Sequence, residues 1–110
     1  MILVHQRYVA KPGLRDRVLD TRIEASRRLA ELGVPAGQIW VPVTGEPGID
    51  QTDAADVIWQ CTYADMQERE RFRALQEGDG TFAAIRTRQG TQLTRWTREH
   101  YRLVERRRPV

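Results

Sequence analysis

The sequence has a single cysteine, Cys61, a single lysine, and no apolar run of the roughly 18 residues that a membrane span needs. A lone cysteine excludes a disulfide within the chain and a zinc site built from several cysteines. The N-terminal residues turn polar at His5, so they lack the long apolar segment of a signal peptide. We therefore predict a cytoplasmic protein.

Several catalytic motifs are also missing from the sequence. It contains no glycine-rich phosphate loop, no Gly-x-Ser-x-Gly elbow and no kinase motif. No spacing of histidines and carboxylates typical of a metal site is present, so we predict neither a metal centre nor a bound cofactor. With 110 residues, 40% hydrophobic and 30% charged, the composition is that of one ordinary globular domain. We place this domain at residues 1–104, followed by a basic tail at residues 105–110.

The net charge of +3 is unevenly distributed, because residues 86–110 carry 8 basic and only 2 acidic side chains. A basic C-terminal region can attract nucleic acid, for example RNA bound by RNA-recognition domains. Those domains require a strand with the pattern Lys/Arg-Gly-Phe/Tyr-Gly/Ala-Phe-Val, which is absent here. We expect a solvated tail and no nucleic-acid partner.

Apolar, aromatic and β-branched residues predict strands at residues 2–10, 38–44, 57–63 and 92–104. Pro42 cannot donate a hydrogen bond to a neighbouring strand, so it favours the edge of the sheet for the second strand. The polar residues 45–56 are typical of an exposed connection.

Apolar residues at helical spacing begin at Leu14, and Gly33 ends this first helix. Asp65 and Glu68 have the spacing of a capping box, which predicts the start of a second helix. Glycines at 78 and 80 interrupt it, and a short helical piece follows over residues 82–90. The order β-α-β-β-α-β predicts an α+β, ferredoxin-like fold, with a four-stranded antiparallel sheet and its helices on one face.

This arrangement leaves the second face of the sheet uncovered. An apolar face of this size is unfavourable in water, and a second copy of the same chain can cover it. The candidates for apolar residues on this face are Leu3, Val9, Trp40, Trp59 and Trp96. We therefore predict a homodimer that forms through the sheet face.

Two stretches of the sequence point to a known group of proteins. Residues 8–13, Tyr-Val-Ala-Lys-Pro-Gly, end the first predicted strand, and residues 63–70, Tyr-Ala-Asp-Met-Gln-Glu-Arg-Glu, join an aromatic strand end to a capped helix. Both resemble the corresponding segments of the dimeric α+β barrel superfamily, most closely its NIPSNAP-like branch. The sequence departs from that pattern at Gln6, where an arginine is frequent, and at Cys61, where a tryptophan is common.

The resemblance implies a homodimeric barrel with a pocket between the sheet and the helices of one subunit. The superfamily includes cofactor-free monooxygenases that act on polycyclic phenols, haem-degrading enzymes, muconolactone-type isomerases and proteins without an assigned activity. It therefore implies a small-molecule-binding protein, with cofactor-independent monooxygenase or isomerase activity on an apolar or aromatic compound. The alternative is a non-catalytic homodimeric interaction or regulatory module.

His5 and His100 are the only histidines, and their strands are neighbours in this topology, so they are candidates for a shared catalytic site. An imidazole can act as a general base on a phenol or as a haem ligand, and it can equally serve as a hydrogen-bonded sheet residue. The aromatic residues form either a pocket for a flat ligand or ordinary core. As ligand-binding candidates we name Tyr8, Trp59, Tyr63 and Trp96. No basic residue adjoins Cys61, so its thiol should stay protonated and inert.

Overall fold

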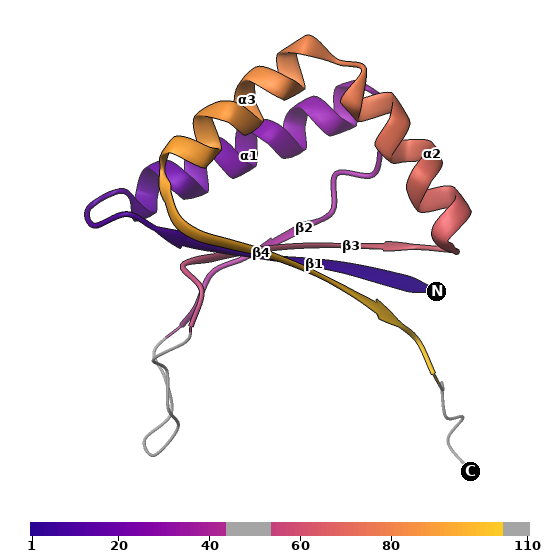
Figure 1. The fold of residues 1–110 in the computed structure, drawn as a ribbon, viewed down its shortest axis with the longest axis horizontal. Coiled ribbons are helices and arrows are strands. Elements are labelled where there is room, and N and C mark those ends of the chain that lie inside the picture. Colours follow the sequence, from indigo (N-terminus) through magenta and orange to yellow (C-terminus); the bar gives the residue numbers. More distant parts are fainter. Residues whose placement is uncertain (44–53, 105–110) are drawn as a thin grey trace.

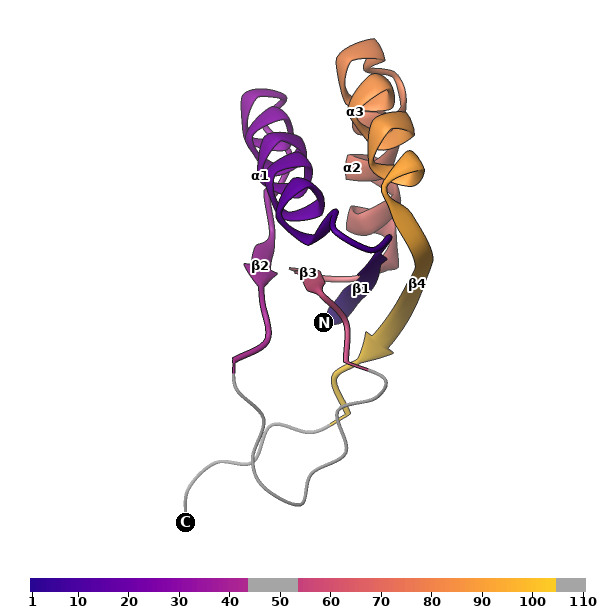
Figure 2. The ribbon, with the colours of Figure 1, turned by 90° about the vertical axis from the view of Figure 1, so that its left-hand side faces the viewer.

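The computed structural model of the chain describes residues 1–43 and 54–104. Its elements are β1 (Ile2–Ala10), α1 (Arg15–Glu31), β2 (Gln38–Trp40), β3 (Val57–Tyr63), α2 (Met66–Glu77), α3 (Gly80–Thr91) and β4 (Leu93–Arg102). The strands form one antiparallel sheet in the order β2-β3-β1-β4, and all three helices cover the same face (Figure 1). Figure 2 shows α1 on the β2 side of this layer and α3 on the β4 side. The predicted ferredoxin-like α+β fold is thus confirmed, including the edge position of β2.

The predicted element bounds need three adjustments. Strand β2 spans only Gln38–Trp40, and β4 is shorter than its predicted range at both ends. The predicted tail and residues 45–53 of the predicted connection lie outside the described residues. The short helical piece is a full helix, α3, because the Asp79 side chain caps it by accepting a hydrogen bond from Phe82 N (2.8 Å). Among the helices that the structure describes, none has the length and apolar character that crossing a membrane requires.

The core lies between the sheet and the helices. Alternate residues of β1 and β3 point toward the helices, and α1 buries Val18, Ala25 and Leu29 against them. Trp59 and Trp96 belong to this covered face, because they pair in register with the buried residues Gln6 and Tyr8. The prediction of these two tryptophans as candidates for the open face is therefore wrong. Leu3, Val9 and Trp40 occupy the open face, as their positions in the register show.

The capping box at the start of α2 forms largely as predicted. The Asp65 carboxylate accepts a hydrogen bond from Glu68 N (2.8 Å). The Glu68 carboxylate reaches back to Ala64 N, one residue before the cap residue itself. Both side chains thereby stabilise the turn between β3 and α2.

Asp79 also connects two helices, α1 and α3. Its carboxylate accepts two hydrogen bonds from the Arg28 guanidinium, from Nε (2.9 Å) and from Nη2 (2.7 Å), in addition to the one from Phe82 N. Hydrogen bonding to Arg28 lowers the pKa of Asp79 from 3.8 to about 2. One carboxylate therefore caps α3 and ties it to α1.

We expect Asp79→Asn to destabilise the protein at neutral pH, because it removes the charged partner of Arg28. Asp79 has a lower pKa in the folded chain, so its contribution is complete above about pH 4 and disappears as the pH falls toward 2. The difference in free energy of unfolding between wild type and Asp79→Asn, measured by urea denaturation, should shrink over that interval. The exposed residue Asp20 provides the control Asp20→Asn. A difference for Asp79→Asn that stays constant between pH 7 and pH 2 would contradict the ion pair.

Candidate functional site

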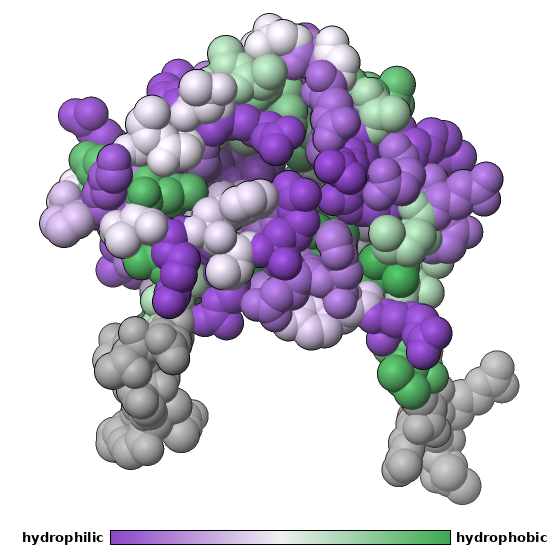
Figure 3. Space-filling model, in the orientation of Figure 1, coloured by the Kyte–Doolittle hydropathy of each residue, from purple (hydrophilic) through white to green (hydrophobic). Residues whose placement is uncertain are grey.

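A cavity of about 510 Å³ lies between the helix-facing side of the sheet and the helices. In Figure 3 the surface is hollowed between α3 and β4, and hydrophilic residues gather around the hollow. The residues that line it are Gln6, Tyr8, Arg22, Ala25, Leu29, Trp59, Gln76, Phe82, Ile85, Arg86, Gln89, Gly90, Leu93, Thr94, Arg95, Trp96 and Arg98. The volume is in the range of small-molecule pockets, and the wall combines aromatic rings with guanidinium groups.

Gln6 is the centre of a hydrogen-bonded chain on the sheet side of the cavity. Its Oε1 accepts from the Tyr8 hydroxyl (2.7 Å) and from Trp96 Nε1 (3.2 Å). The Tyr8 hydroxyl in turn accepts from Arg22 Nη1 (3.3 Å). These bonds hold Tyr8 and Trp96 in fixed orientations in the cavity wall.

Two arginines lie over two indole rings in this wall. The guanidinium carbon of Arg22 lies 4.9 Å from the centre of the Trp59 ring, and that of Arg98 lies 4.9 Å from the centre of the Trp96 ring. Arg22 is only 6% exposed, and its Nη2 donates to Ser26 Oγ (3.3 Å). The Nε atoms of Arg22 and Arg98 are shielded from water and have no hydrogen-bond partner within residues 1–43 and 54–104.

Positive charge dominates the electrostatics of the cavity. Burial lowers the pKa of Arg98, and the charges of Arg69, Arg86 and Arg73 lower it further. The described residues that line the cavity include no histidine, aspartate or glutamate. The wall is thus cationic and aromatic, without a group that titrates near neutral pH.

Three of the four predicted ligand-binding residues, Tyr8, Trp59 and Trp96, line this cavity. Tyr63 does not line it. Its ring lies 6.3 Å from that of Phe72 and 6.0 Å from the guanidinium carbon of Arg69, and burial raises its pKa well above the ordinary value. The structure therefore brings together the three aromatic residues nearest Gln6 and leaves Tyr63 in the core beneath α2.

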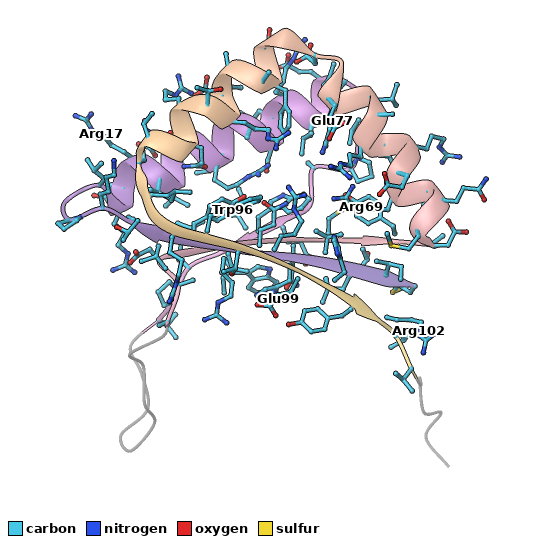
Figure 4. All side chains as sticks on the ribbon, viewed as in Figure 1. Arg17, Arg69, Glu77, Trp96, Glu99 and Arg102 are labelled. Atoms are coloured by element: carbon cyan, nitrogen blue, oxygen red, sulfur yellow. The ribbon has the colours of Figure 1, made fainter. Side chains whose placement is uncertain are left out.

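The structure does not bring His5 and His100 together. Val4 pairs with His100 and His5 with Glu99, so the two histidines lie on opposite faces of the sheet although β1 and β4 are neighbours. Figure 4 labels one residue of β4 on each face. Trp96, which shares its face with His100, lies on the helix side, and Glu99, which pairs with His5, lies on the other side. The prediction that the two histidines share a site is therefore wrong.

Neither histidine lines the cavity. A hydrogen bond joins His5 Nδ1 and Gln60 Oε1 (3.3 Å), and the His5 ring meets that of Tyr101 edge-on on the open face. His100 lies on the helix-facing side, where desolvation and the nearby charges of Arg69 and Arg98 lower its pKa. The low pKa keeps the His100 imidazole largely neutral at neutral pH.

Cys61 is buried on β3, and desolvation raises the pKa of its thiol. A thiol with a raised pKa is largely protonated at neutral pH, so it is a poor nucleophile and metal ligand. In the part of the chain that the structure describes, no three histidine, cysteine, aspartate or glutamate side chains gather where they could hold a metal ion.

Residue patterns in the sequence did not identify the arginines of the cavity wall. The signal was present in α1, where Arg22 follows Val18 by four residues and precedes Leu29 by seven, and so lies on the buried stripe of the helix. A charged residue within an apolar stripe is unusual and indicates a buried polar function. Arg98 has no such signal, because arginines are frequent throughout the C-terminal region.

No protein-family model matches the chain, and no curated protein matches it in sequence. Solved structures do match it in fold. An uncharacterized NIPSNAP domain protein from Burkholderia xenovorans has a TM-score of 0.67 at 13% identity, covering 94% of this chain and 95% of that protein. A NIPSNAP family protein from Agrobacterium tumefaciens has a TM-score of 0.65 at 15% identity, covering 94% of this chain and 86% of that one.

An antibiotic biosynthesis monooxygenase is similar to the same degree. Its TM-score is 0.66 at 16% identity, and the match covers 96% of this chain and 100% of that chain. Identities this low carry the fold and not the activity. The chain therefore has the ferredoxin-like α+β fold that it shares with these NIPSNAP proteins and this monooxygenase, as the resemblance in its sequence predicts.

Proposed function

We propose that this protein binds a small compound with an apolar ring in the cavity between its sheet and its helices. The observation that carries the proposal is the cavity itself, about 510 Å³, with Tyr8, Trp59 and Trp96 in its wall. Ligand pockets of about 300–1,000 Å³ usually combine apolar surface with a few placed polar groups. Here the apolar surface comes from the indole rings together with side chains such as Leu29 and Phe82, and the polar groups are Gln6 and the arginines.

Binding is better supported than catalysis. A general base has to lie within hydrogen-bond reach of the proton that it removes, and both histidines lie outside the described cavity wall. A monooxygenase or isomerase activity in which His5 or His100 moves a proton stays a prediction. The fold shared with an antibiotic biosynthesis monooxygenase makes oxygen consumption with phenolic compounds the activity to assay.

The binding proposal is tested by narrowing the cavity. Gly90 lines it, and a Cβ built at Gly90 would meet no atom within 4 Å, so the helix can accept a side chain there. We expect Gly90→Phe to weaken binding of a neutral two-ring probe, 2-naphthamide, by about tenfold or more in isothermal titration calorimetry.

The control for this experiment is Gly80→Phe, which adds the same side chain to the same helix away from the cavity. A Cβ at Gly80 also meets no atom within 4 Å. This variant should bind 2-naphthamide as wild type does. If wild type binds neither 2-naphthamide nor the corresponding carboxylate, 2-naphthoate, or if both variants bind 2-naphthamide equally well, the cavity is not the binding site.

We also propose that a second copy of the chain covers the open face of the sheet. In support, Trp40 lies on this face and is 50% exposed, and Tyr101, 47% exposed, stands beside Leu3 in the register. Large apolar side chains that remain exposed on one face of a sheet are typical of interaction surfaces. If this homodimer forms and no ring compound binds, the non-catalytic interaction module is the better interpretation.

Native mass spectrometry should therefore report two chains for the wild type. We expect Trp40→Glu to weaken the dimer by about tenfold or more, because it places a charge within an apolar contact. Leu75→Glu is the matched control, since Leu75 is a 55% exposed apolar residue of α2 on the helical side. A monomeric wild type, or equal effects of the two variants, would contradict a dimer through the sheet face.

A further inference from the structure

The arginines that face the cavity lack the carboxylate partners that other arginines have. Among the described residues, the arginines in ion pairs are Arg15, Arg28, Arg71, Arg73 and Arg88. Arg22, Arg86, Arg95 and Arg98 line the cavity and take part in none of these pairs. Arg22 is buried and Arg98 is partly buried, so two guanidinium groups of the wall that water reaches poorly have no negative partner among the described residues.

This arrangement is costly for an empty cavity. A buried guanidinium gives up its hydration, and only a negative charge or strong acceptors can compensate for that loss. Arg22, at 6% exposure, bonds to two neutral hydroxyls, those of Tyr8 and Ser26, and its Nε has no partner among them. An anion in the cavity would supply the missing compensation.

The positive charge converges on Arg98. Arg86 of α3 and Arg69 and Arg73 of α2 come close enough to disfavour its charged form, and its Nε is buried without a described partner. In Figure 4, Arg69 lies between α2 and the sheet, on the same side of β4 as Trp96. A negatively charged group of a ligand would therefore be stabilised most strongly at Arg98.

The cavity wall also places this charge next to flat apolar surface. Gln6 pairs with Trp59 on one side and with Arg98 on the other, and neighbouring strands are about 4.8 Å apart, so these two side chains stand about 10 Å apart across the sheet. Trp96 lies beside Arg98 on β4. A ligand one or two rings long can touch the indoles and still reach the guanidinium.

From these positions we infer that the cavity binds an aromatic carboxylate, with its ring against Trp59 and Trp96 and its carboxylate at Arg98. The inference rests on the proposed binding function and names its ligand class. A guanidinium that stacks on a ring by its face keeps its N–H groups free along its edge, where a planar carboxylate can accept two parallel hydrogen bonds. Arg22 and Arg86 add positive potential from the helical side.

The test compares two ligands of nearly equal shape, 2-naphthoate and the neutral 2-naphthamide, by isothermal titration calorimetry. We expect wild type to bind the carboxylate about tenfold or more tightly than the amide, the effect of a charge-assisted hydrogen bond in a shielded site. Equal affinities would overturn the inference and leave the proposed binding function intact. Absence of binding by both ligands would overturn both.

The role of Arg98 is tested with Arg98→Gln, which keeps a polar side chain and removes the charge. This variant should lose the preference for 2-naphthoate over 2-naphthamide. Arg27→Gln is the control, because Arg27 is an exposed residue of α1 that does not line the cavity and its loss changes the net charge equally. A preference for the carboxylate that survives in Arg98→Gln, or falls equally in Arg27→Gln, would overturn the assignment.

Discussion

Replacing Gly37 with alanine should lower the free energy of unfolding by about 3 kcal/mol, the sum of backbone strain and overpacking. Gly37 has φ = 71°, in the left-handed region that favours glycine. A Cβ there would lie 2.5 Å from Trp59 Nε1 and 2.7 Å from Gln60 O. The indole cannot move aside freely, because it is buried and its Nε1 donates to Ala36 O (2.8 Å).

Gly33→Ala separates the two causes. Gly33 has nearly the same backbone angle, φ = 73°, but a Cβ there meets no atom within 4 Å. Gly33→Ala should lower the free energy of unfolding by about 1 kcal/mol, which is the strain of the left-handed conformation alone. Urea denaturation of both variants measures the difference, and the tryptophan emission of Gly37→Ala should change because Trp59 shifts. Equal losses of stability in the two variants would show that the contact between the new Cβ and Trp59 does not add to the destabilisation by Gly37→Ala.

Local patterns in the sequence were sufficient for the elements of this fold. Helical spacing in α1, the capping box at Asp65 and the prolyl residue after β2 each act over a few residues, and the structure confirms what they predict. In β3 the alternate residues Val57, Trp59, Cys61 and Tyr63 share one buried face. Alternation does not show which of the two faces the helices cover. For this reason Trp59 was a candidate for the open face, although it lies on the covered face.

The candidate site depends on information that no local pattern contains. The two histidines lie on neighbouring strands, as expected, but a register in which Val4 pairs with His100 places them on opposite faces. The cavity likewise depends on how α1 and α3 cross the sheet. Arg22 and Trp59 are far apart in the sequence and meet only through that packing. Tyr8, Trp59 and Trp96 were predicted from residue type, whereas their convergence around Gln6 required the structure.

Leu29→Ala should lower the free energy of unfolding by about 3 kcal/mol, within the usual range for leucine in a core. Leu29 is 1% exposed, lies in the core between α1 and the sheet, and also lines the cavity. The space left by the missing atoms joins the existing cavity instead of forming a separate void. The variant should therefore accept a larger ligand while its stability, measured by urea denaturation, decreases.

The change in ligand size is what distinguishes Leu29 from other core residues. We expect Leu29→Ala to bind the three-ring compound anthracene-2-carboxamide more tightly than wild type does, relative to 2-naphthamide. Val18→Ala is the control, because Val18 is fully buried on the same helix but does not line the cavity. It should lose stability without a change in preference between the two amides. If both variants, or neither, shift that preference, Leu29 does not limit the space available to the ligand, and the cavity wall between α1 and the sheet is not where the ring lies.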